Sequence, residues 1–109
     1  MNDPLSHNNP TYLGIDLGTT NTVVAIKNEN FPTTILQTET GSRLLPSIVH
    51  YLKDSTLIGY QAKDKLISDP KNTYYSTKRL MGVNHEKLDD TLKNIYNYKL
   101  KNNNGKIYL

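Results

Sequence analysis

The first stretch that could carry chemistry is GIDLGTTNT, residues 14–22. Asp16 lies within an apolar run, and the small or polar residues after Leu17 are Gly18, Thr19, Thr20 and Asn21. A tight turn directly after a strand can direct several backbone N–H groups at a phosphate, and threonine hydroxyls add further donors. A carboxylate at the strand end can hold Mg²⁺ through its water shell. The stretch therefore suits phosphoryl transfer, and an ordinary threonine-rich hairpin turn remains the alternative.

A second candidate is TKRLMG, residues 77–82, in which Lys78 and Arg79 are adjacent. Neighbouring residues leave a helix in different directions, so one cation could point inward while the other stays solvated. A lysine that reaches a terminal phosphate would neutralise charge that develops in the transition state. The alternative is a solvated pair near a helix C-terminus, where cations interact favourably with the helix dipole.

Strands must position the first of these stretches. Alternating and β-branched residues predict three strands in an antiparallel meander, at residues 12–17, 22–27 and 31–38. Gly41 and Pro46 mark the segment 38–47 as a loop. Two shorter strands are then predicted, at residues 48–52 and 56–59.

Helices are predicted mainly in the second half of the chain. Apolar spacing favours a helix over residues 60–67 and a weaker one over 86–95. A further helix through YYSTKRLM, residues 74–81, would begin at a cap at Asn72 or Thr73 and end before Gly82. At the end of the chain, NYKL and KIYL predict a hairpin, with Asn104-Gly105 favouring a tight turn.

Composition excludes several classes of protein. The chain has 109 residues and no cysteine, so disulfides, thiolate catalysis and cysteine-based metal sites are excluded. Its formal charge of +3 is the difference between 13 cations and 10 anions, and the cations are spread along the chain, which argues against nucleic acid as a partner. Its first residues lack the features of a secretory signal, and its apolar runs are shorter than a membrane helix requires. We therefore expect a cytoplasmic protein that does not bind membranes.

Several strings, taken in order, resemble the seventy-kilodalton heat-shock chaperone family. They are GIDLGTTNTVVAI, GSRLLPSIVHY, LIGYQAK, the pair Asn72-Thr73 and STKRLMG. Their order and separation match the first lobe of the family's ATPase domain over nearly all of the chain after residue 11. LLPSIVHY leans towards the HscA type of iron–sulfur cluster assembly, because the DnaK type usually has Thr-Thr-Pro-Ser there; the DnaK type is next.

The resemblance implies an α/β fold: a partial actin-like ATPase (ribonuclease H-like) lobe, with a strand meander followed by a smaller α+β subdomain. Residues 1–11 would be a flexible leader, and 12–47 the first strands and phosphate loop of the inner subdomain. Residues 48–109 would be a truncated outer subdomain. The implied ligands are ATP or ADP with Mg²⁺, and K⁺ is allowed.

The resemblance also assigns roles to single residues. Asp16 would hold Mg²⁺ through water, and Lys78 would be the catalytic lysine beside the γ-phosphate. The first phosphate loop would consist of Gly18, Thr19, Thr20 and Asn21.

By the same resemblance, the chain is the N-terminal ATP-binding segment of a chaperone ATPase that couples hydrolysis to client binding. Its implied partners are a J-domain co-chaperone and an iron–sulfur scaffold client. Two alternatives stay open: a fragment of a general DnaK-like chaperone, and a non-catalytic remnant that acts only as a binding module. One phosphate loop cannot enclose a nucleotide, so we expect the chain alone to be inactive in hydrolysis.

Overall fold

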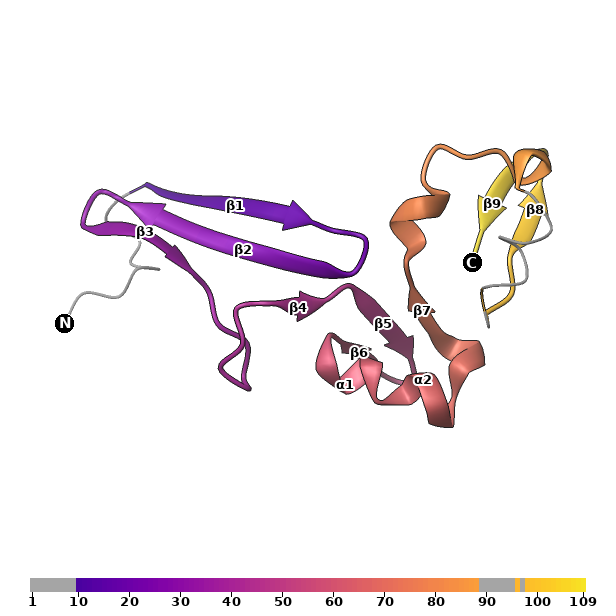
Figure 1. Cartoon of the computed structure of the whole chain (residues 1–109), viewed down its shortest axis with the longest axis horizontal. Helices are drawn as coiled ribbons and strands as arrows, with labels where there is room; N and C mark the ends of the chain where they lie inside the picture. The colour runs from indigo at the N-terminus through magenta and orange to yellow at the C-terminus, as the bar shows by residue number, and fades with distance from the viewer. Residues whose placement is uncertain (1–9, 89–95, 97) are drawn as a thin grey trace.

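The computed structural model describes residues 10–88, 96 and 98–109 and shows a mixed α/β chain (Figure 1). The first sheet has four strands in these residues: β1 (Thr11–Leu17), β2 (Asn21–Asn28), β3 (Phe31–Ile35) and β4 (Leu45–Pro46). β1, β2 and β3 form the predicted antiparallel meander, and β4 pairs with the start of β2. Two residues of the predicted 38–47 loop are thus in a strand.

The second sheet has the order β6-β5-β7. Its strands are β5 (Ile48–Tyr51), β6 (Thr56–Ile58) and β7 (Thr73–Tyr75). Between β6 and β7 lie α1 (Tyr60–Lys63), α2 (Lys65–Ser68) and the 3₁₀ turn η1 (Pro70–Asn72). The predicted helix over 60–67 is therefore present as two short helices that meet at Asp64.

The predicted helix over residues 74–81 is wrong. Thr73–Tyr75 is strand β7, which pairs with β5 and places Tyr75 opposite Ile48. Ser76 then adopts a left-handed conformation with φ of 53°, which ends the strand before the 3₁₀ helix η2 (Thr77–Leu80). Aromatic and β-branched residues pack well on a pleated sheet, and the free edge of β5 overrode the helical pattern.

The C-terminal part is a small hairpin packed on short 3₁₀ turns. η3 (His85–Lys87) is the described part of the predicted 86–95 helix, whose residues 89–95 lie outside the described residues. β8 (Lys101–Asn103) and β9 (Lys106–Tyr108) form the predicted hairpin, although its first strand begins later than NYKL. Asn104 and Gly105 both have positive φ, as the predicted tight turn requires.

Buried side chains are divided between separate parts of the chain. One cluster joins Leu80 and Leu88 to Tyr96 and Tyr98, with Tyr74 and Tyr75 packed against it. The radius of gyration is 17.5 Å, against about 13 Å for a compact domain of this size. β1 has no buried residue, and Ile15 is 65% exposed. The described residues therefore leave the first sheet largely uncovered.

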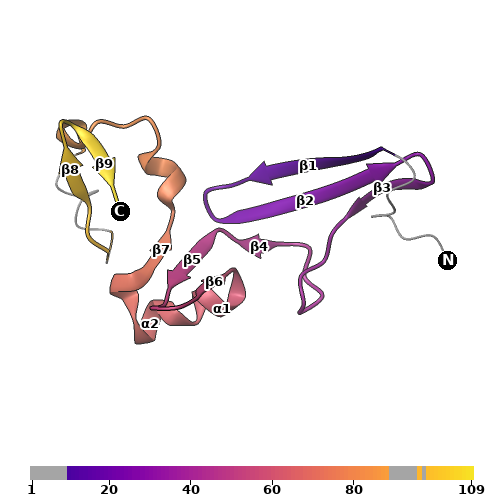
Figure 2. The ribbon, with the colours of Figure 1, turned by 180° about the vertical axis from the view of Figure 1, so that it is seen from behind.

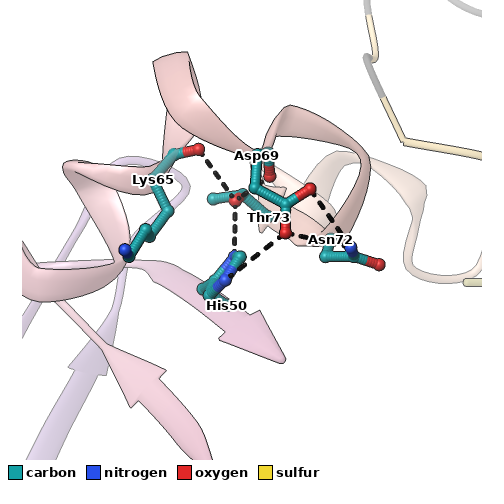
Figure 3. A network of polar contacts seen from close by, with 5 residues as sticks. All are labelled: His50, Lys65, Asp69, Asn72 and Thr73. Carbon is teal, nitrogen blue, oxygen red and sulfur yellow. Dashed lines mark hydrogen bonds and ion pairs between the residues drawn. The ribbon is translucent and has the colours of Figure 1, made fainter. Parts of the chain in front are cut away.

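A buried polar network ties the second sheet to the α2–η1 turn (Figure 3). The Thr73 hydroxyl donates to the Asp69 carbonyl at 2.7 Å, so it accepts from His50 Nδ1 at 2.8 Å. His50 is fully buried, and its Nε2 lies 3.7 Å from Asp69 Oδ2. The side chain of Asn72 donates to the same carboxylate.

None of the described helices is long and apolar enough to cross a membrane.

Candidate functional site

The turn between β1 and β2 is tight and depends on a glycine. Gly18 N–H donates to the Asn21 carbonyl at 2.9 Å, which closes the four-residue turn Gly18–Asn21. A Cβ at Gly18 would lie 2.3 Å from that same carbonyl oxygen, whereas a Cβ at Gly14 would meet nothing within 4 Å. Gly18 is therefore required by the close approach of two backbone segments.

The middle of this turn leaves backbone donors available. Among the described residues, the N–H groups of Thr19 and Thr20 donate to no other group. Thr20 is exposed, and Thr19 is half-buried. Successive unpaired N–H groups in a turn form a concave surface that binds anions. The turn can therefore accept phosphate oxygens without first breaking a hydrogen bond.

Lys78 reaches this turn from the other half of the chain. Its Nζ donates to the Leu17 carbonyl at 2.8 Å, across 61 residues of sequence. Both ribbon views show the tip of the β1–β2 hairpin directed at the segment that follows β7, where η2 lies (Figures 1 and 2). An ammonium group has three donors, so two remain for a ligand. Lys78 lies in η2, which directly follows the left-handed residue Ser76.

Asp16 is exposed on β1, opposite Val23 and one residue before the carbonyl that Lys78 contacts. Its carboxylate forms no ion pair with a described residue. The described residues contain no group of three or more metal-ligating side chains. A single carboxylate suits Mg²⁺, which keeps most of its water ligands, better than a metal that requires a full protein cage.

The structure places Gly18, Thr19, Thr20 and Asn21 in one turn, Lys78 against the carbonyl of Leu17 and Asp16 in the same strand as Leu17. They form an open surface. Two cavities lie elsewhere, one of about 630 Å³ beside Val83 and one of about 480 Å³ beside Tyr60. Neither cavity is lined by any of these site residues. These residues offer an anion one face and do not enclose it.

Sequence reasoning missed one residue of this region. Ser47 follows β4 and hydrogen-bonds the carbonyls of Gly18 and Thr20, both at 2.8 Å. The sequence signals it only by its place in the string LLPS, which belongs to the family resemblance and to the predicted loop 38–47.

Comparison with known proteins bears on this site. The model of the family described as "Hsp70 protein" matches residues 12–109. A "Chaperone protein HscA homolog" of Cupriavidus taiwanensis is 50% identical over 80 residues, which cover 72% of this chain and 13% of the relative. A "Chaperone protein dnaK1" of Prochlorococcus marinus subsp. pastoris is 43% identical over 97 residues, covering 87% of this chain and 14% of the relative.

A third relative gives the same result. The "Mitochondrial-type heat shock protein 70" of Encephalitozoon hellem is 45% identical over 78 residues, which cover 72% of this chain and 12% of the relative. The chain therefore spans only a small part of the length of these relatives.

Proposed function

Since the chain belongs to the Hsp70 family, we propose that its Gly18–Asn21 turn and Lys78 bind the terminal phosphates of ATP. Membership confirms the actin-like α/β fold class expected from the sequence. It also confirms the resemblance to HscA and DnaK chaperones, which both appear among the relatives. Nucleotide binding is the function that this family membership and the site's geometry both favour.

The observation that carries the proposal is the 2.8 Å contact between Lys78 Nζ and the Leu17 carbonyl. It places a positive charge beside a turn whose Thr19 and Thr20 amides have no partner among the described residues. Charged and dipolar donors that are held in place before a phosphate arrives stabilise it without reorganisation. The alternative of a lysine that is merely solvated does not account for this contact.

Asp16 is the residue that we propose holds Mg²⁺, through water. Its carboxylate is exposed and belongs to the same strand as Leu17. Bound Mg²⁺ would neutralise charge on the phosphate oxygens. K⁺ is a second cation that the resemblance allows.

The role of the longer protein is also a proposal. We place it with HscA-type chaperones, in maturation of iron–sulfur proteins in the cytoplasm, with a J-domain co-chaperone and an iron–sulfur scaffold as partners. Residues 12–47 would form the inner subdomain of its first lobe and 48–109 part of the outer one. Support comes from the HscA homologues among the relatives. A DnaK-type general chaperone is the second candidate, supported by the 43% identical relative.

The test is an NMR titration of the 109-residue chain with MgATP and with inorganic tripolyphosphate. We expect shifts of the Thr19 and Thr20 amides, and about tenfold weaker binding in Lys78→Ala, which loses a charge-assisted hydrogen bond. Arg79→Ala is the matched control, because Arg79 is the adjacent exposed cation. Absence of binding, or equal losses in both variants, would contradict the proposal.

A coupled ATPase assay addresses the open geometry of the site. We expect no turnover above background from the chain alone, because its described residues do not enclose a nucleotide. Turnover that disappears in Lys78→Ala would show this expectation to be wrong and would favour catalysis by the isolated segment. A chain that binds no nucleotide would instead favour the non-catalytic binding module.

A further inference from the structure

Ser47 lies outside the β1–β2 hairpin and makes two hydrogen bonds to the turn of that hairpin. Its hydroxyl donates to the Gly18 carbonyl at 2.8 Å, and its N–H donates to the Thr20 carbonyl at 2.8 Å. Its Oγ also lies 2.8 Å from Thr22 Oγ1. These contacts bridge 25 to 29 residues of sequence.

The protons of these hydroxyls can be assigned. A serine hydroxyl has one proton, and that of Ser47 goes to the Gly18 carbonyl. Thr22 must therefore be the donor in its contact with Ser47. The result is a chain of hydrogen bonds with one direction. The Thr22 hydroxyl donates to the Ser47 hydroxyl, which in turn donates to the Gly18 carbonyl.

This chain determines where the turn's amides point. In a trans peptide the N–H is antiparallel to the C=O, and the described residues contain no cis peptide. Because the Gly18 and Thr20 carbonyls are both directed at Ser47, the N–H groups of Thr19 and Asn21 are directed away from it. The carbonyl oxygens, which would repel an anion, are thereby kept on the Ser47 side.

We propose that Ser47 is a positioning residue for the anion site, acting through the orientation of the Gly18–Thr19 and Thr20–Asn21 peptides. This inference rests on the proposed function, because it concerns the same turn. Ser47 itself touches no ligand in this scheme. β4 supplies its position, since the pairing of Asn21 with Pro46 places the next residue beside the turn.

The experiment measures tripolyphosphate and MgATP affinity of the 109-residue chain by NMR, with the thermal unfolding midpoint recorded for every variant. Ser47→Ala should bind about 5- to 30-fold more weakly, because the Gly18 carbonyl loses the hydroxyl that fixes its direction, whereas the backbone N–H of residue 47 still donates to the Thr20 carbonyl. Ser47→Thr keeps the hydroxyl and should restore binding. Ser42→Ala is the control: this hydroxyl bonds the Leu44 carbonyl and Tyr60 and does not touch the turn.

Thr22→Val removes only the first donor of the chain. It should weaken binding less than Ser47→Ala, and the double variant should bind like Ser47→Ala alone, because Thr22 acts through Ser47. This variant keeps the test open if Ser47→Ala does not fold. The unfolding midpoint separates the two roles, since a purely structural serine would lower it without changing the affinity of the folded fraction.

The outcomes distinguish the two proposals. Wild-type chain that binds neither ligand overturns the proposed function. Wild-type chain that binds, while folded Ser47→Ala and Thr22→Val bind equally well, overturns the role of Ser47 alone. Weaker binding with a reduced shift of the Thr19 amide, restored in Ser47→Thr, supports it.

Discussion

Replacing Gly18 by alanine should damage the turn far more than the same change four residues earlier. The added Cβ would lie 2.3 Å from the Asn21 carbonyl oxygen and must retreat to at least 3.4 Å for ordinary contact. A movement of this size would break the 2.9 Å hydrogen bond between Gly18 N–H and that oxygen. Overpacking and the lost bond together should lower the free energy of unfolding by about 2 to 4 kcal/mol.

Gly14→Ala is the matched control. Gly14 lies in the same strand, and a Cβ there would meet nothing within 4 Å. Alanine at a compatible position reduces the entropy of the unfolded chain, so we expect a gain of up to about 1 kcal/mol. Urea unfolding followed by circular dichroism should therefore give a midpoint for Gly18→Ala about 1 to 2 M below wild type.

Anion binding gives a second readout of the same pair. Gly18→Ala should lose the tripolyphosphate shifts at Thr19 and Thr20, and Gly14→Ala should keep them. If both variants unfold at the same urea concentration and bind alike, the close contact at Gly18 does not determine the turn. That result would refute the reasoning from backbone approach.

Two further predictions concern the rest of the chain. Thr73→Val leaves buried His50 Nδ1 without its partner, so the free energy of unfolding should fall by about 1 to 3 kcal/mol in urea melts. The control Thr34→Val, at an exposed hydroxyl, should change the free energy of unfolding by less than about 0.5 kcal/mol. Equal effects of the two variants would contradict the role of the network. Burial, and then the neighbouring Tyr96, Tyr75 and Tyr74, raise the pKa of Tyr98 above its ordinary value of 10.0. The contribution of neutral Tyr98 to the free energy of unfolding should therefore be complete below about pH 10 and fall as the pH rises further. Melts from pH 8 to 11 should show a smaller fall in Tyr98→Phe than in wild type, whereas exposed Tyr108→Phe should follow wild type; a wild-type chain with constant stability across this range would refute the assignment.

The sequence determined the elements whose signal is local. β1, β2 and the β8–β9 turn were predicted because period-two alternation and Asn-Gly chemistry act over a few residues. The residues proposed to bind phosphate could be selected for the same reason, since Gly18 and its threonines are adjacent. Family membership likewise follows from the order of strings along the chain.

Only the tertiary structure decided the rest. Residues 74 and 75 could be read as the start of a helix over 74–81, whereas the structure pairs Thr73–Tyr75 with the free edge of β5. The approach of Lys78 to Leu17 and of Ser47 to Gly18 crosses 61 and 29 residues. No local pattern encodes such contacts, because they depend on how the sheets and the left-handed turn at Ser76 direct the chain in space. The sequence names the groups that suit a phosphate, and the fold sets their distances and directions.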